Sequence, residues 1–98
     1  MGSPSDDATR LLFLLAQAAR GGMSGAAGLG IAYWTRWEPG RINDAVETLR
    51  ARGWIQVRVF PPAEPYGFHT AAITEAGMVA IEKAVQDMQN AKEADRVG

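Results

Sequence analysis

The 98-residue chain contains no cysteine, which excludes disulfide bonds, thiolate metal sites and catalysis by a thiol. It has one histidine, His69, with no acidic or nucleophilic partner at a recognisable spacing, and a single imidazole cannot form a metal site. The glycine-rich run from Gly21 to Gly30 lacks the lysine and the preceding strand of a phosphate-binding loop. We therefore expect no enzyme, no metal and no cofactor.

Long apolar runs and a strong charge bias are also missing. No run approaches the roughly 20 apolar residues that span a bilayer, and Asp6 and Asp7 stand where a signal peptide would be basic. The net charge of −1 argues against an indiscriminate nucleic-acid binder. The length suits one soluble domain, so we expect a cytoplasmic protein with no membrane partner.

The charge that is present is unevenly distributed. Residues 36–58 hold five arginines against three acids, a local surplus of two positive charges. Residues 75–98 hold five acids against three bases, a local surplus of two negative charges. The basic excess therefore falls on one segment in the middle of the chain.

Hydrophobic periodicity predicts three helices in the first half of the chain. The first covers residues 6–20 and ends at Gly21-Gly22. The second covers residues 23–34, with Ser24 as its N-cap. The third begins at Pro39, which suits a first helical turn, and ends at Gly53. We expect the second helix to turn these residues inward: Ala27, Leu29, Ala32 and Tyr33.

The second half predicts a β-hairpin and a final helix. Apolar and polar residues alternate over 54–60, a proline-rich loop of about seven residues follows, and residues 68–74 form the returning strand. Thr74 is expected to cap the last helix. This order predicts an α+β fold, a winged helix-turn-helix domain spanning residues 6–89, with flexible tails at 1–5 and 90–98.

Two short motifs strengthen that assignment. A leucine, three residues and a glycine precede an apolar strand, and the pattern Ile-Thr-x-x-Gly opens the final helix. In these features residues 8–89 resemble bacterial winged-helix regulators of the MarR, PadR and ArsR kind. The matching residues are Leu49, Gly53, Ile55, Val57, Ile73, Thr74 and Gly77.

The resemblance implies a sequence-specific DNA-binding transcriptional regulator, a repressor that acts as a homodimer on double-stranded DNA. By that resemblance the third helix enters the major groove and the hairpin reaches the neighbouring backbone or minor groove. Arginines would contact phosphates, and Asn43 would read adenine. The candidate DNA-binding residues are Arg36, Arg41, Asn43, Thr48, Arg50 and Arg58.

A different reading of these residues stays open. The arginines can instead form a solvated face with local pairs such as Glu47–Arg50 or Glu38–Arg41, and Asn43 can be an ordinary surface residue. At 100° per residue, the positions opposite the apolar stripe of the third helix include two acids, which would repel phosphate. These positions are Gly40, Asp44, Glu47 and Ala51.

An alternative function follows from this acidic ridge, namely a protein–protein interaction module without DNA binding. It would use the ridge together with the Pro/Tyr/Phe wing, where Tyr66 and Phe68 either contact a partner or pin the loop to its own domain. We expect Trp34, Trp37 and Trp54 to lie in the core, with a ligand or partner surface as the alternative for Trp34 and Trp37.

The last helix carries a narrow apolar seam at spacings of three and four residues. The seam either packs on the first helix of the same chain or pairs with the same seam of a second chain in a dimer, and we favour the dimer. The candidate dimerisation residues are Met78, Ile81, Val85 and Met88.

Overall fold

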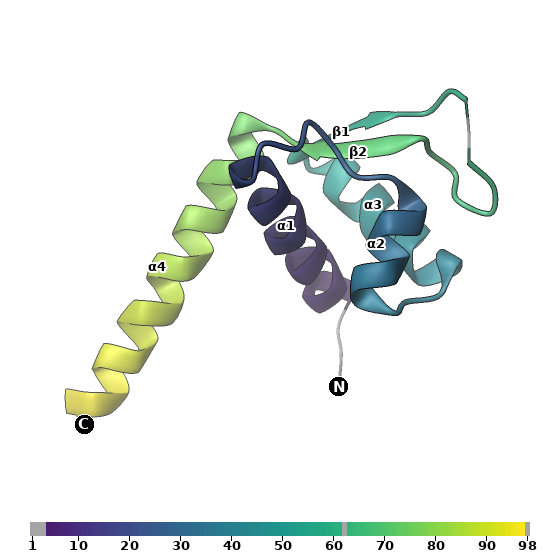
Figure 1. Ribbon diagram of the computed structural model, residues 1–98. Coiled ribbons are helices and arrows are strands. Elements are labelled where there is room, and N and C mark those ends of the chain that lie inside the picture. The colour runs from purple at the N-terminus through teal and green to yellow at the C-terminus, as the bar shows by residue number, and fades with distance from the viewer. Residues whose placement is uncertain (1–3, 62, 98) are drawn as a thin grey trace.

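The computed structural model describes residues 4–61 and 63–97. Three helices come first: α1 (Pro4–Arg20), α2 (Gly28–Thr35) and α3 (Pro39–Ala51). The antiparallel strands β1 (Ile55–Arg58) and β2 (Thr70–Ile73) follow, and α4 (Glu75–Val97) ends the fold (Figure 1). This order confirms the predicted α+β class and winged-helix arrangement.

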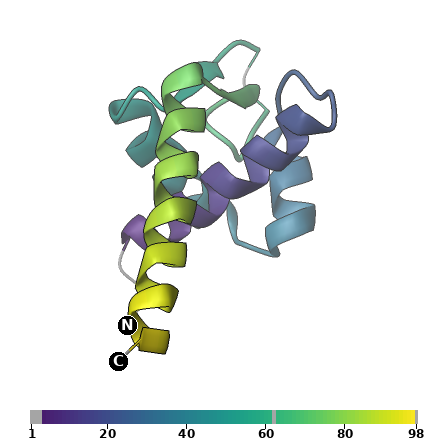
Figure 2. The same ribbon diagram turned by 90° about the vertical axis from the view of Figure 1, so that its left-hand side faces the viewer.

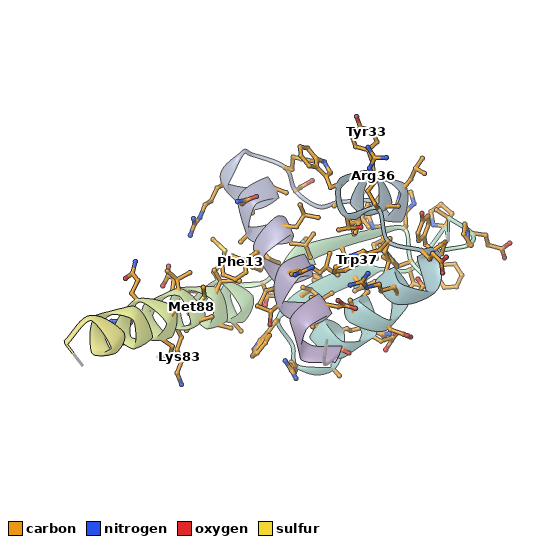
Figure 3. All side chains as sticks on the ribbon, turned by 90° about the horizontal axis from the view of Figure 1, so that it is seen from below. Phe13, Tyr33, Arg36, Trp37, Lys83 and Met88 are labelled. Atoms are coloured by element: carbon orange, nitrogen blue, oxygen red, sulfur yellow. The ribbon has the colours of Figure 1, made fainter. Side chains whose placement is uncertain are left out.

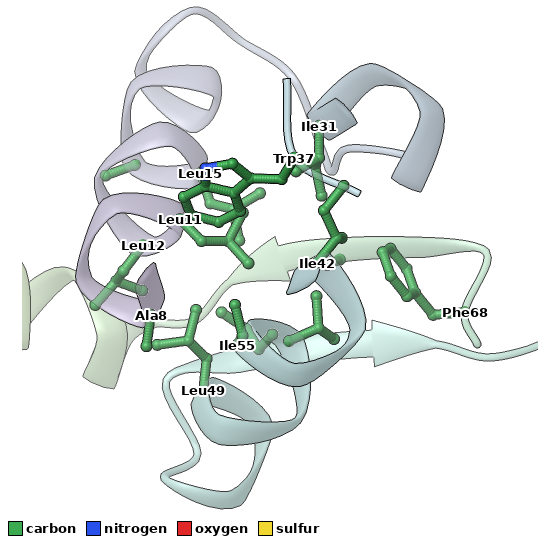
Figure 4. Close-up of a cluster of buried hydrophobic side chains, with 14 of the residues drawn as sticks. Ala8, Leu11, Leu12, Leu15, Ile31, Trp37, Ile42, Leu49, Ile55 and Phe68 are labelled. Atoms are coloured by element: carbon green, nitrogen blue, oxygen red, sulfur yellow. The ribbon is translucent and has the colours of Figure 1, made fainter. Parts of the chain in front are cut away.

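The core lies where the first three helices meet the hairpin (Figure 4). Helix α1 packs mainly on α3 and β2 and buries Ala8, Leu11, Leu12, Leu15 and Ala16, whereas Ala18 is half-buried and Ala19 is exposed. Helix α3 buries its predicted apolar stripe against α1 and β1. The largest fully buried side chains are Phe68, Leu11, Leu15, Ile31, Ile42 and Leu49.

The hairpin pairs Ile55 with Ile73 at one end and Arg58 with Thr70 at the other. A third segment joins it, because the backbones of Ala26 and Ala71 exchange two hydrogen bonds of 2.8 and 2.9 Å. This bridge fixes the loop that leads into α2. The sequence gives no sign of it.

Helix α2 differs from the prediction in its start and in its inward face. It begins at Gly28, with Ala27 rather than Ser24 at the N-cap position. The residues toward the core are Gly28, Ile31, Ala32 and Thr35, whereas Leu29 and Tyr33 are each 74% exposed. The cause is a contact between residues far apart in the chain. A Cβ at Gly28 would overlap the Tyr66 ring, so this face of α2 lies tight against the wing loop, the segment between β1 and β2.

The three tryptophans differ in how deeply they are buried. Trp37 is buried, and Trp54 is half-buried against the core, as predicted. The prediction for Trp34 is wrong, because its side chain is 73% exposed. The inward positions of α2 are taken by smaller residues, which leaves Trp34 on the outer side.

A compact set of contacts joins the end of α3 to the start of α4. Gly53 ends α3 with a φ of +74°, a conformation that favours glycine. The Thr74 hydroxyl donates to the Gly53 carbonyl at 2.8 Å and accepts from the Gly77 N–H at 3.2 Å, so Thr74 is the predicted N-cap. A Cβ at Gly77 would overlap the Trp54 carbonyl oxygen. The two motifs of the sequence therefore meet in space as one junction.

Helix α4 leaves the domain at this junction and extends away from it (Figures 1 and 2). Its main contacts with other helices and strands are with α1 and β2. No helix among the described residues is both long and apolar enough to cross a membrane. Of the predicted flexible tails, residues 1–3 and 98 lie outside the described residues, and α1 and α4 extend into the rest, so flexibility there stays a prediction.

Candidate nucleic-acid interface

Helix α3 presents its predicted outer ridge to solvent. Gly40, Asp44, Glu47 and Ala51 are all exposed, and the stripe on the opposite side is buried. The helical wheel drawn from the sequence is therefore confirmed. The two acids stand at the centre of the exposed face of α3.

The wing loop is tied directly to α3 by Asn43. The side-chain N–H of Asn43 donates to the Pro65 carbonyl at 3.2 Å, and the Gly67 N–H donates to Asn43 Oδ1 at 3.0 Å. Both ends of the amide are thus engaged, and reading adenine would require Asn43 to release the loop. Nothing in the spacing of the sequence points to this contact.

The wing aromatics pack inward. Tyr66 is 7% and Phe68 2% exposed, and their ring centroids are 6.2 Å apart. They pin the loop to its own domain, which was one of the two predicted alternatives. Neither ring is free to contact a sugar or a protein partner, whereas Phe60 at the base of the loop is exposed.

Arg41 is held by an acid from α1. Its Nε and Nη2 donate to the two carboxylate oxygens of Asp7 at 2.8 Å each, and its guanidinium lies 4.5 Å from the Trp37 ring centroid. The hydrogen bond from Arg41 lowers the pKa of Asp7, and the same bond raises the pKa of Arg41. The predicted Glu38–Arg41 pair is not the one that forms. Asp7 neutralises much of the charge that Arg41 would bring to a phosphate.

Arg50 and Thr48 lie on either side of the acidic ridge. Arg50 pairs with Glu47 at 3.2 Å, and both side chains are more than half exposed, so the pair is weak. The Thr48 hydroxyl donates to the Asp44 carbonyl at 3.0 Å within the helix. Arg50 also lines a hollow of about 70 Å³ between α3 and the wing. It can swing from Glu47 to a phosphate at little cost.

Arg36 and Arg58 lie off α3. Arg36 is the C-cap of α2, with a φ of +62°, and its guanidinium is 6.0 Å from the Tyr33 ring (Figure 3). Val59 lines the hollow beside α3, whereas Arg58 lines a different hollow together with Gln56, the residue on the same face of β1. The predicted set is therefore brought together only in part. Arg58 faces away from the α3 ridge.

The candidate dimerisation seam is divided along α4. Ile81 is buried and Met78 is half-buried against the domain, near α1 and β2. Val85 is 36% exposed, and Met88 is 60% exposed on the part of α4 that extends outward (Figure 3). The first half of the seam packs within the chain, and the second half is uncovered.

The charges around the α3 ridge balance. Four arginines, Arg36, Arg41, Arg50 and Arg52, are set against four acids: Asp7, Glu38, Asp44 and Glu47. Among the described residues, no group of three or more His, Asp or Glu side chains could hold a metal ion. The surface is suited to contact through shape and a few directed polar groups more than through bulk positive charge.

Comparison with protein-family models, curated proteins and solved structures finds no match for this chain. The winged-helix-like assignment therefore rests on the order of its elements and on the packing described above.

Proposed function

We propose that the chain is a non-enzymatic, sequence-specific DNA-binding transcriptional regulator, a repressor that acts as a homodimer in the cytoplasm. The observation that carries this proposal is the exposed face of α3, held beside a wing loop that Asn43 attaches to the same helix. A helix fits the major groove, where each base pair presents a distinct set of donors and acceptors.

In the proposed complex α3 enters the major groove along its ridge. Arg50 leaves Glu47 for a phosphate on one side, and Arg41 and Arg36 approach the backbone on the other. Asp44 and Glu47 meet the base edges, where a carboxylate accepts a hydrogen bond from cytosine N4 and repels nearby phosphates. We therefore expect modest affinity with a shallow salt dependence.

The test is a fluorescence anisotropy titration of the chain against its own promoter DNA at two salt concentrations. The wild type should bind, and its affinity should fall with salt by a slope of roughly 0.9 per phosphate neutralised. Arg50→Ala should weaken binding and reduce that slope. Absence of binding at low salt, or binding without a salt slope, would overturn the proposal.

Removing the acids tests their role. The double variant Asp44→Ala with Glu47→Ala should tighten DNA binding if the carboxylates mainly repel phosphate. Glu82→Ala with Asp87→Ala is the matched control, because it removes the same charge from exposed positions on α4. Equal tightening by both variants would mean that only net charge matters and that α3 is not the contact surface.

The homodimer is proposed from the uncovered half of the α4 seam. Val85→Glu with Met88→Glu should convert a dimer to a monomer in sedimentation equilibrium, because it places charge where apolar side chains would meet. Gln86→Glu with Gln89→Glu adds the same charge at neighbouring exposed positions and should leave the dimer intact. A wild-type chain that stays monomeric at all concentrations would contradict this arrangement.

The alternative function, a protein-interaction module, is favoured by the acidic ridge alone. The wing aromatics that this alternative also requires, Tyr66 and Phe68, are buried and do not form a contact surface. Under this alternative, removing Asp44 and Glu47 should abolish capture of a basic protein partner and should not improve DNA binding.

A further inference from the structure

The outer side of α2 carries apolar side chains that the domain does not cover. Leu29, Tyr33 and Trp34 on the helix are about three-quarters exposed, and Met23 in the preceding loop is also exposed. Figure 3 shows Tyr33 pointing away from the body of the protein. Side chains of this size at the surface often mark a binding site.

Beside this surface lies a hollow of about 310 Å³. It is enclosed by the second half of α1, the loop before α2, and α2 itself, with Met23 and Trp34 among its lining residues. The volume falls in the lower part of the range of small-molecule pockets.

The hollow exists because the residues that meet there are small. Ala18, Ala26 and Gly30 line it, and a Cβ built on Gly30 would have no heavy atom within 4 Å. The bridge between Ala26 and Ala71 holds the loop in place, so that the loop does not close onto α2. Within the glycine-rich run, Gly28 allows the contact with Tyr66, and Gly30 leaves this space open.

The chemistry of the lining is apolar and uncharged. Among the described residues, no acidic or basic side chain lines the hollow, so a charged ligand would lose its hydration with no compensating partner. The indole of Trp34 offers a face for a flat ring, and Tyr33 packs edge-on against it at 6.3 Å between ring centroids. Gln17 supplies one amide side chain able to donate and accept hydrogen bonds.

We propose that this hollow binds a neutral small molecule that contains an aromatic ring and one hydrogen-bonding group. The ring stacks on Trp34 above the alanine and glycine floor, and the polar group meets Gln17. The site lies between α1 and α2, with Ile31 also in its lining, and its test requires no DNA.

The experiment is a titration of the full chain with 2-naphthol, followed by the indole N–H signals of the tryptophans in ¹H–¹⁵N NMR spectra. Trp34→Phe assigns the Trp34 signal. That signal should move on titration, while those of Trp37 and Trp54 should stay in place. The anion 2-naphthoate has the same ring system and should bind at least about tenfold more weakly, because the lining holds no cation.

Two variants test the site. Gly30→Leu adds a side chain at the wall and should reduce 2-naphthol affinity at least about tenfold, while improving helix propensity, so folding is preserved. Gly40→Leu is the matched control: it makes the same change at another open helical position, on α3, and should leave affinity unchanged. Trp34→Ala removes the stacking face from an exposed position and should also weaken binding.

Several outcomes would overturn the proposal. They are no movement of the Trp34 signal with 2-naphthol, movement of the Trp37 or Trp54 signals instead, or equal affinity of Gly30→Leu and wild type. A Trp34 signal that shifts on simple dilution without any probe would show that a second copy of the chain covers this surface, and would equally exclude a free ligand pocket.

Discussion

A substitution at Asn43 distinguishes two roles of this residue, holding the wing loop and reading a DNA base. The substitution Asn43→Ala removes two hydrogen bonds to the wing loop, of 3.2 and 3.0 Å. A hydrogen bond of this kind contributes about 0.5–1.5 kcal/mol. Pro65 and Gly67 are exposed, so their freed backbone groups bind water and add no desolvation cost. We expect a loss of about 1–2 kcal/mol in the free energy of unfolding.

For a domain of this size, that loss corresponds to a fall in Tm of roughly 4–15 °C. Thermal unfolding followed by circular dichroism measures it. Thr48→Ala is the control on the same helix, because it removes only a hydrogen bond to the helix's own backbone and should change Tm little. In binding to a randomised DNA pool, Asn43→Ala should weaken all sequences alike. An unchanged Tm, together with relaxed preference at one base position, would refute the wing-holding role and restore base reading.

Other substitutions test the remaining contacts. The pKa of Asp7 is lowered by its hydrogen bond from Arg41, so this ion pair stabilises the fold above the ordinary pKa of 3.8 and the contribution is lost as pH falls through the lowered value. Asp7→Asn should therefore be less stable than wild type at neutral pH, with the difference in unfolding free energy vanishing in strong acid; a pH-independent difference would contradict this. Gly77→Ala should cost about 1–3 kcal/mol in urea unfolding, because the new methyl group meets the Trp54 carbonyl oxygen, which cannot move aside. Gly40→Ala, at an open helical position, should instead stabilise the chain by up to about 1 kcal/mol, and a similar effect of both substitutions would show that the close contact at Gly77 is absent.

The parts of the fold that the sequence predicts are those governed by local periodicity. The ridge of α3 follows from the position of its apolar stripe, and Gly53 and Thr74 mark helix ends through backbone conformation and capping. The inward face of α2 was not predictable in this way, since it depends on the contact between Gly28 and Tyr66, far apart in the chain.

The candidate site shows the same limit. Asn43 meets a loop more than twenty residues away, and Arg41 meets Asp7 from a different helix. Neither contact leaves a periodic signal, because each depends on how whole elements pack. The sequence pattern therefore places Arg41 and Asn43 on the outer side of α3 but does not predict their contacts with Asp7 and the wing loop.

The contacts among Thr74, Gly53, Gly77 and Trp54 fix the direction of the first turn of α4 relative to the last turn of α3. In a dimer built through α4, the angle at which two copies cross would then set the distance between their α3 helices. That distance must match about 34 Å, one turn of DNA, or a multiple of it. In the proposed dimer, changes along the outer half of α4 would thus alter the spacing of the two DNA half-sites without altering the preferred bases.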